Sequence, residues 1–386
     1  MKTKYFILFI IFTFSFTSLI AQSYERYKKL KDTTIQSTNL RFDKKISVTV
    51  PIEWQKGLKN NFPLIVVFDR QNKRSHQYIL NTIDYLTSTE QIPSSVIVSI
   101  ESEQRYRYIE TQYKISEKNG IAEENEKFIF DELIPLAEKE FKASPVRIFV
   151  GHSRYGYFTT SLFSSRINDL TGVISMSPFF DQQNVDLTDS IKKLNNLTYH
   201  SKKYYRFAIG NDFPTDYNKM DSVITKNINN PFLNLKSTRF NQASHDVTPG
   251  LLIGNALYEV FEDWSFQQSK YISNQQKDLR IKSSLDRQIE KNYGARINFS
   301  LGILNGKGWY FYNEKQYEKA IQAWTILTDS YPNFSEGYLS IIKAKILLKQ
   351  SYSQALEKFK LSLSQSELYK EQDKKELEKE LQEIIK

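Results

Sequence analysis

The chain contains no cysteine among its 386 residues. This absence excludes structural disulfides, thiolate metal sites and a lipid-modified N-terminal cysteine. The chain also lacks a convincing membrane span. Residues 5–20 are apolar, but serine and threonine interrupt the run, and it is shorter than the roughly 20 residues that a span requires. We therefore expect no stable span in the mature protein, and no feature of the sequence implies a metal or an organic cofactor.

The same N-terminal run has the flanks of a secretory signal peptide. Lys2 and Lys4 precede it, and Ala21 places a small residue before Gln22. A basic start, an apolar middle and a small residue at the cleavage point are typical of such peptides. We expect residues 1–21 to be removed and the mature protein to be periplasmic or secreted.

Charge of one sign does not accumulate along the chain. Lys and Arg total 53 and Asp and Glu 44, for a net charge of +9, but basic residues are spread out and interleaved with acids. This distribution argues against a nucleic-acid partner. The 24 tyrosines and 26 phenylalanines are ample for a core and for aromatic site walls, and the length predicts two domains.

Strand-like and helix-like segments alternate between residues 42 and 265. Short apolar runs bounded by polar turns predict buried strands at residues 63–68, 96–100, 146–150, 172–176 and 204–209. Helical spacing covers residues 122–141, where Pro135 is expected to cause a kink. This alternation predicts an α/β fold with a doubly wound, mostly parallel sheet over residues 22–266.

An internal repeat begins after a polar, helical connector at residues 267–300. Tyr317, Ala320 and Trp324 recur 35 residues later as Tyr352, Ala355 and Phe359. This spacing resembles the tetratricopeptide repeat, a helix–turn–helix unit. We expect residues 301–386 to form a small all-α domain that contacts only its own neighbours and the connector, and it is a candidate site for a protein or peptide partner.

The candidate nucleophile follows the run at 146–150. Residues 151–156 read GHSRYG, and Ser153 occupies the turn between a strand and a helix-like stretch. This is the sequence form of a nucleophile elbow, in which the helix N-terminus offers N–H groups to an oxyanion. The usual second glycine is replaced by Tyr155, with Gly156 one residue later.

A serine nucleophile requires a base, and the chain offers four histidines. His152 adjoins the serine, His76 lies early in the chain, and His200 immediately precedes a predicted strand. His245 lies in a loop after the last strand-like segment. Because the chain order in α/β-hydrolases is serine, acid, histidine, His245 is the preferred base.

The acid is expected between the strand at 204–209 and His245. Asp212 leads because it lies at the exit of this strand, and Asp216 and Asp221 are alternatives. A carboxylate there would orient the imidazole and stabilise its cation.

Residues 42–265 resemble an esterase family of α/β-hydrolases that includes esterase D, enterochelin-esterase-like enzymes, and feruloyl and acetylxylan esterases. The segments that carry the resemblance are Pro63–Gln71, Ile92–Pro93, Val98–Ile100 with Arg105 and Arg107, Phe130–Pro135 with Glu138–Phe141, Gly151–Ser153 and Met176–Pro178. The resemblance implies Ser153 as nucleophile and His245 as base. It also implies an oxyanion hole formed by the N–H of Arg154 and that of Arg70 or Gln71.

Two departures from the family pattern lie beside this site. The family has glycine where this chain has Arg70 and Tyr155. Arg70 is expected to narrow the acyl site or to attract an anionic substrate. Tyr155 needs extra room beside the strand. Its replacement by glycine is expected to preserve the fold, at a cost of several kcal/mol for the cavity that the aromatic ring leaves, and to maintain or increase activity.

The leading interpretation is a secreted serine carboxylic-ester hydrolase that forms an acyl-enzyme on Ser153. Its expected substrate is a small-molecule, carbohydrate or siderophore ester. An alternative is a catalytically impaired hydrolase scaffold that acts as a binding module through its helical repeats. A third interpretation, a serine peptidase, is disfavoured because the resemblance is to esterases.

Overall fold

The computed structural model describes residues 24–58, 60–114, 120–182 and 185–386. The expected signal peptide, residues 1–21, lies outside the described residues, and its cleavage stays a prediction. Within the described ranges, no helix combines the length and apolar character that a bilayer crossing needs.

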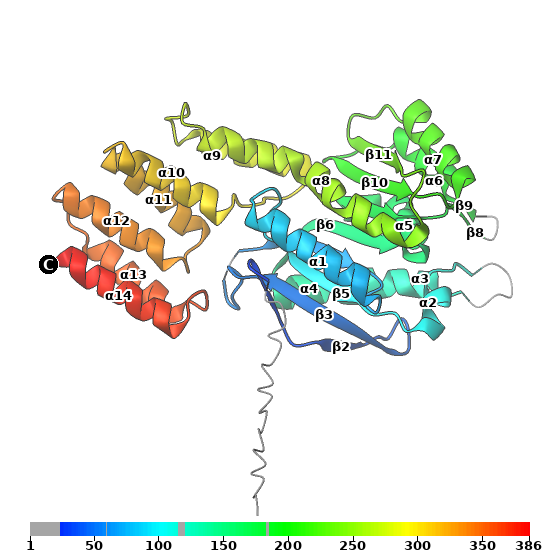
Figure 1. The fold of residues 1–386 in the computed structure, drawn as a ribbon, viewed down its shortest axis with the longest axis horizontal. Coiled ribbons are helices and arrows are strands. Elements are labelled where there is room, and N and C mark those ends of the chain that lie inside the picture. Colours follow the sequence, from blue (N-terminus) through cyan, green and yellow to red (C-terminus); the bar gives the residue numbers. More distant parts are fainter. Residues whose placement is uncertain (1–23, 59, 115–119, 183–184) are drawn as a thin grey trace, which may run out of the picture.

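A nine-stranded sheet forms the centre of the fold (Figure 1). Its strands are β1 Tyr27–Lys29, β2 Thr33–Gln36, β3 Asp43–Pro51, β4 Phe62–Val67, β5 Val96–Ile100, β6 Ala143–His152, β7 Gly172–Met176, β10 Lys203–Ile209 and β11 Leu233–Arg239. The order is β1-β3-β5-β4-β6-β7-β10-β11, with β2 also paired to β3. Pairing is parallel from β5 to β11 and antiparallel around β3. The expected α/β class is confirmed, and each of the five predicted strands is present.

Helices cover both faces of this sheet. The helices of this part of the chain are α1 Lys73–Ser88, α2 Gln104–Glu110, α3 Ala122–Lys127, α4 Ile134–Phe141, α5 Arg154–Ser165, α6 Leu187–Lys193, α7 Pro214–Asn227 and α8 Thr248–Ile272. Short 3₁₀ turns cover Ile167–Asp169, Leu194–Asn196 and His245–Val247, and β8 Asp181–Gln182 pairs with β9 Val185–Asp186. Helices α1 and α8 pack on one face, and α3 to α7 pack on the other.

The strands read as continuous apolar runs because both of their faces are buried. In β4, Ile65 and Val67 pack with α1 and α8, whereas Leu64 and Val66 face the opposite core. All four side chains are fully buried. Such runs are typical of parallel strands covered by helices on both sides.

The helical stretch predicted at 122–141 is present, but its hydrogen-bonding pattern changes along its length. Between α3 and α4, residues Phe128–Leu133 form a π-helical segment. Pro135 lies in the first turn of α4, where its missing N–H is tolerated, and the kink expected there stays a prediction.

The C-terminal third of the chain is helical throughout. Its helices are α9 Ile281–Tyr293, α10 Leu301–Asn313, α11 Tyr317–Ser330, α12 Ser335–Leu347, α13 Ser353–Gln365 and α14 Glu371–Ile385. Helix α8 continues to Ile272, past the expected domain boundary at 266, and Trp264 and Tyr271 on either side of that boundary are buried. The sheet unit and the helical region therefore share a helix.

Close packing of α10 against α11 depends on small residues and one tryptophan. A Cβ on Gly308 would lie 2.1 Å from Trp324 Nε1, and the same Nε1–H donates to Asn305 Oδ1 at 3.0 Å. Ala320, Ala355 and Phe359 are buried. The helix pairs fit the repeat pattern, and the tetratricopeptide assignment itself stays a proposal.

The helical region also contacts the sheet unit directly. The Asn60 amide donates to the Ser330 carbonyl at 2.5 Å, and the Gln55 amide donates to the Gln365 carbonyl at 2.7 Å. The expectation that the repeats contact only their neighbours and the connector is therefore wrong. Polar loop residues near β3 and β4 reach the helix ends, a contact that no local sequence pattern signals.

Candidate active site

Ser153 lies at a sharp turn between β6 and α5. Its backbone has φ 59° and ψ −119°, a strained conformation for a residue with a side chain. The Ser153 N–H donates to the Met176 carbonyl on the neighbouring strand at 2.9 Å. At Gly151, a Cβ would lie only 2.3 Å from the Tyr155 carbonyl oxygen, so this position requires glycine. The turn has the geometry of a nucleophile elbow.

His245 and Asp212 come from two loops at the carboxyl edge of the sheet. Asp212 follows β10, and His245 follows β11 and precedes α8. His245 Nδ1 and Asp212 Oδ2 are 2.5 Å apart. The other oxygen of Asp212 accepts the Gly210 N–H at 3.0 Å. This pairing can hold the imidazole in one orientation, with its Nε2 free for proton transfer.

The alternative acids are engaged elsewhere. Asp216 accepts the Phe180 N–H at 2.6 Å, and Asp221 accepts the hydroxyl of Ser237. Within the described residues, neither carboxylate is hydrogen-bonded or ion-paired to His245. The structure thus brings Asp212, and not Asp216 or Asp221, to the histidine.

The other histidines do not occupy the position of a base. His200 is exposed and precedes the amino end of β10, at the opposite edge of the sheet from Ser153. His76 Nε2 lies 2.8 Å from Ser99 Oγ, and burial together with the nearby Arg70 cation lowers the pKa of His76 to about 4. His152 Nε2 lies 3.1 Å from the backbone carbonyl of His245. Burial, and then the adjacent His245 ring, lower the pKa of His152.

Ser153 and His245 line one cavity of about 390 Å³. The other lining residues are Asp69, Gln71, Asn72, Gln104, Arg107, His152 and Asp246. The described side chains form no hydrogen bond between Ser153 and His245. Catalytic contacts of this kind are often long in the free enzyme and tighten with substrate.

The two candidate oxyanion donors after β4 differ in availability. The Arg70 N–H donates to the Ile100 carbonyl at 2.9 Å, so it is not available to an oxyanion. No backbone acceptor is recorded within the described residues for the Gln71 N–H, and Gln71 lines the cavity. The Arg154 N–H, directly after Ser153, belongs to the open first turn of α5.

The Arg70 side chain corrects a second expectation. Its guanidinium pairs with Asp32 at 2.6 Å and lines neither of the cavities near Ser153. Arg70 therefore does not narrow the acyl site or present a charge to the substrate. Asp32, which directly precedes β2, holds the Arg70 side chain away from the cavity that Ser153 lines.

An ion pair that the sequence did not reveal holds the loop after β4. Arg107 Nε and Nη2 donate to the two oxygens of Asp69 at 2.8 and 2.6 Å. The Gln71 side-chain amide donates to the same Asp69 carboxylate at 2.8 Å. Burial opposes the Arg107 cation, but the Asp69 carboxylate outweighs it, and the pKa of Arg107 is raised. In the sequence, Arg107 was noted only within a segment that carries the resemblance to the esterase family, and no role was predicted for it.

Tyr155 lies in a buried polar network behind the elbow. Its ring stacks on Phe68 with centroids 4.7 Å apart. Its hydroxyl donates to Glu110 at 2.5 Å and lies 2.5 Å from Ser102 Oγ. Lys44 in turn pairs with Glu110 at 2.6 Å. All of these side chains are buried, so the tyrosine ring fills space between them. Glycine at this position would leave a void and would remove one hydrogen bond to the Glu110 carboxylate.

One group of donors could in principle hold a cation. Donor atoms of His152, His245 and Asp246 all lie within 4.8 Å of one another. His245 Nδ1 is already paired with Asp212, so a cation would have to take the nitrogen that a base needs. We build no catalytic step on this group.

Comparison with known proteins agrees with this geometry. A family model described as "Putative esterase" matches residues 37–279. This range includes Ser153, Asp212 and His245. No curated protein matches the sequence.

Several solved structures share the fold. An uncharacterised protein from Capnocytophaga ochracea has a TM-score of 0.59 at 11% identity, covering 92% of this chain and 100% of its own. An IroE-like serine hydrolase from Shewanella oneidensis has a TM-score of 0.59 at 15% identity, covering 78% and 99%. The BES protein from Bacillus cereus has a TM-score of 0.51 at 18% identity, covering 67% and 99%. The first match extends beyond residues 37–279, so part of the fold outside the esterase range recurs in another protein.

Proposed function

Because this chain belongs to the Putative esterase family, we propose that it is a serine carboxylic-ester hydrolase that acts through an acyl-enzyme on Ser153. The observation that carries the proposal is the 2.5 Å contact between His245 and Asp212, beside a serine on a strained strand-to-helix turn. Burial of the pair is partial, with 32% of the His245 side chain exposed, so substrate can reach it.

The proposed reaction has two halves. In the first, Ser153 Oγ attacks the ester carbonyl while His245 Nε2 takes its proton. The tetrahedral intermediate then expels the alcohol oxygen, which receives that proton from His245. In the second, His245 takes a proton from water, the water oxygen attacks the acyl-enzyme, and Ser153 leaves with the proton as the acid is released. Asp212 orients the imidazole and stabilises its cation throughout.

The negative charge on the carbonyl oxygen would be held by two backbone N–H groups. We assign these to Arg154, at the start of α5, and to Gln71, on the loop after β4. Asp69 and Arg107 act as positioning residues for this loop, since Asp69 binds both Arg107 and the Gln71 side chain. Donors that are fixed before the reaction stabilise the transition state without reorganisation.

Location and partners belong to the same proposal. The basic, apolar and small residues within residues 1–21 support export to the periplasm or the exterior. The substrate would be a small-molecule, carbohydrate or siderophore ester. The tetratricopeptide-like helices provide a candidate surface for a protein or peptide.

Labelling by a fluorophosphonate, mapped to a residue, tests the proposal. We expect the label on Ser153, together with turnover of p-nitrophenyl acetate by the wild type. Ser153→Ala and His245→Ala should each lower turnover by a factor on the order of 10⁴ or more. The double variant should be little worse, because the residues act as a unit. Asp212→Asn should cost less, and His200→Ala is the control.

Three results would contradict the proposal. Turnover that survives in folded Ser153→Ala would remove the nucleophile. A wild type that is neither labelled nor active would favour the binding-module alternative. Cleavage confined to a peptide library would favour the peptidase.

A further inference from the structure

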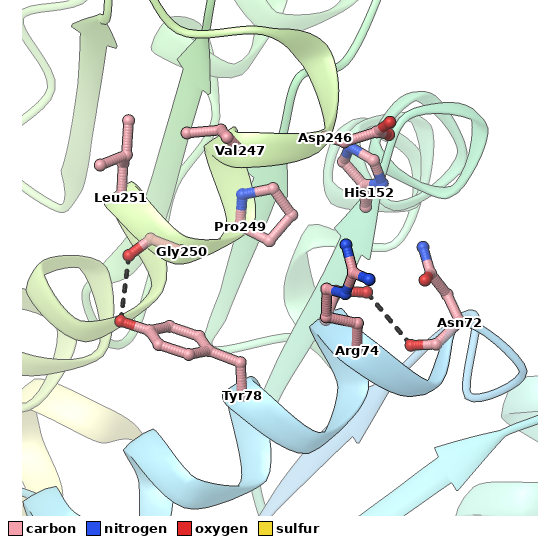
Figure 2. A pocket seen from close by; sticks show the side chains of 10 residues that line it. Asn72, Arg74, Tyr78, His152, Asp246, Val247, Pro249, Gly250 and Leu251 are labelled. Atoms are coloured by element: carbon pink, nitrogen blue, oxygen red, sulfur yellow. Dashed lines mark hydrogen bonds between the residues drawn. The ribbon is translucent and has the colours of Figure 1, made fainter.

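A second cavity of about 760 Å³ adjoins the one that holds Ser153 (Figure 2). Asn72, His152 and Asp246 line both cavities, so the space continues from one into the other. Its walls come from the first turns of α1 and α8, which lie at the same edge of the sheet as Ser153. A volume of this size can accommodate a sizeable organic group.

The cavity has one polar end and one apolar end. Figure 2 shows Asn72, Arg74 and Asp246 gathered near His152, with Tyr78 and Leu251 at the other end. Tyr78, Val247 and Leu251 are each 47% exposed. Single exposed apolar residues are ordinary, but three that line one cavity mark a surface that a ligand can cover.

One hydrogen bond joins the two walls at the apolar end. The Tyr78 hydroxyl donates to the Gly250 carbonyl at 3.1 Å and ties α1 to the first turn of α8. A Cβ on Gly250 would meet no atom within 4 Å. A side chain at position 250 would therefore extend into open space beside the cavity.

The position of His245 indicates which half of an ester would enter this cavity. In the proposed reaction, His245 must protonate the departing alcohol oxygen, so the alcohol lies on the His245 side of the scissile bond. Asp246, Val247, Pro249, Gly250 and Leu251 follow His245 directly and line the cavity. The space therefore extends from the leaving-group side.

We propose that this cavity is the alcohol subsite and that it accepts a bulky, apolar or aromatic alcohol moiety, with the ester group at the polar end beside His152. The proposal rests on the esterase function proposed above and adds the substrate class. The acyl group would occupy the cavity that Ser153 lines.

Placing one naphthyl group on either half of an ester tests this assignment. The substrates are 2-(2-naphthyl)ethyl acetate, with the ring on the alcohol, and ethyl 2-naphthylacetate, with the ring on the acyl group. Ethyl acetate is the small reference, and all three release an alkyl alcohol. The measurement is kcat/KM for each ester relative to ethyl acetate.

Gly250→Leu fills the cavity from a position where the structure has room for the new side chain. We expect it to lower relative kcat/KM for the naphthylethyl ester about tenfold, the scale at which small changes in an apolar pocket discriminate. The acyl-naphthyl ester and ethyl acetate should change by less than about twofold. Leu251→Ala removes one apolar side chain from the wall and should also lower relative kcat/KM for the naphthylethyl ester, without adding bulk to the cavity. Leu347→Ala, a similarly exposed leucine on α12, is the control.

A loss confined to the acyl-naphthyl ester would overturn the assignment, as would equal ratios in wild type and Gly250→Leu. Fluorophosphonate labelling of Ser153 in every variant separates these results from a failure of catalysis. An unlabelled, inactive wild type would refute the esterase function and the subsite with it. A labelled, active wild type with unaltered ratios would refute the subsite alone.

Discussion

Removing the Tyr155 hydroxyl should destabilise the protein measurably. The hydroxyl donates to Glu110, a carboxylate with no exposed surface. Loss of a hydrogen bond to a charged group costs about 1.5–3 kcal/mol. In Tyr155→Phe, Lys44 and Ser102 still bind Glu110, so we expect a loss within that range and a folded protein.

Tyr155→Gly should cost more, and it should not rescue activity. Truncation of a packed aromatic side chain costs about 3–5 kcal/mol, and glycine in a helix adds about 1 kcal/mol. The sum is a large part of the total of about 5–15 kcal/mol that stabilises a typical domain. The structure therefore argues against the expectation that glycine at 155 is tolerated and restores an ordinary elbow.

Urea unfolding at pH 7, followed by tryptophan fluorescence and far-UV circular dichroism, measures both changes. Tyr157→Phe is the matched control, because Tyr157 lies on the same helix, is 1% exposed, and forms no side-chain hydrogen bond with the described residues. Its loss of a hydroxyl should cost little. If Tyr155→Phe costs no more than Tyr157→Phe, the network does not stabilise the fold and the reasoning fails.

The glycines of the elbow, His76 and helix α8 each give a further prediction. Gly151→Ala should abolish esterase activity and destabilise the elbow, because the alanine Cβ would lie 2.3 Å from the Tyr155 carbonyl oxygen. Gly156→Ala should have a milder effect, because the atom nearest to its Cβ would be 3.2 Å away. Equal activity in the two variants would contradict this prediction. The free energy of unfolding should fall as pH drops from about 6.5 to 4. Burial and the Arg70 cation lower the pKa of His76 to about 4 in the folded protein, so the unfolded chain binds the proton first as the pH falls. His76→Gln should flatten this pH dependence, and an unchanged slope in that variant would contradict the prediction. A chain that ends at residue 266 should be insoluble or should unfold without cooperativity, because the cut divides α8 and removes the buried Tyr271. A soluble truncation with full p-nitrophenyl acetate turnover would contradict this, since the sheet unit would then fold independently of the helical region.

Local sequence patterns predicted much of the fold. Both faces of the central strands are covered, so each strand appears in the sequence as a short apolar run, and the five predicted runs correspond to β4, β5, β6, β7 and β10. The apolar run before Ser153 and the residues GHSRYG predicted the strand-to-helix turn from neighbouring residues alone. The antiparallel strands β1, β2 and β3 and the edge strand β11 were not predicted, because they are more polar or partly exposed.

The sequence by itself therefore determined the α/β class, the position of the serine turn and the order of the candidate residues, since these depend on neighbours along the chain. Only the tertiary structure decided which aspartate meets His245, because three candidates lie within ten residues of one another and the direction of each side chain depends on its loop. The tertiary structure likewise decided that Arg70 pairs with Asp32 and that Tyr155 donates to Glu110. It also decided that the helical region contacts the sheet unit. Each is a meeting of side chains distant in sequence, which folding alone brings within hydrogen-bonding distance.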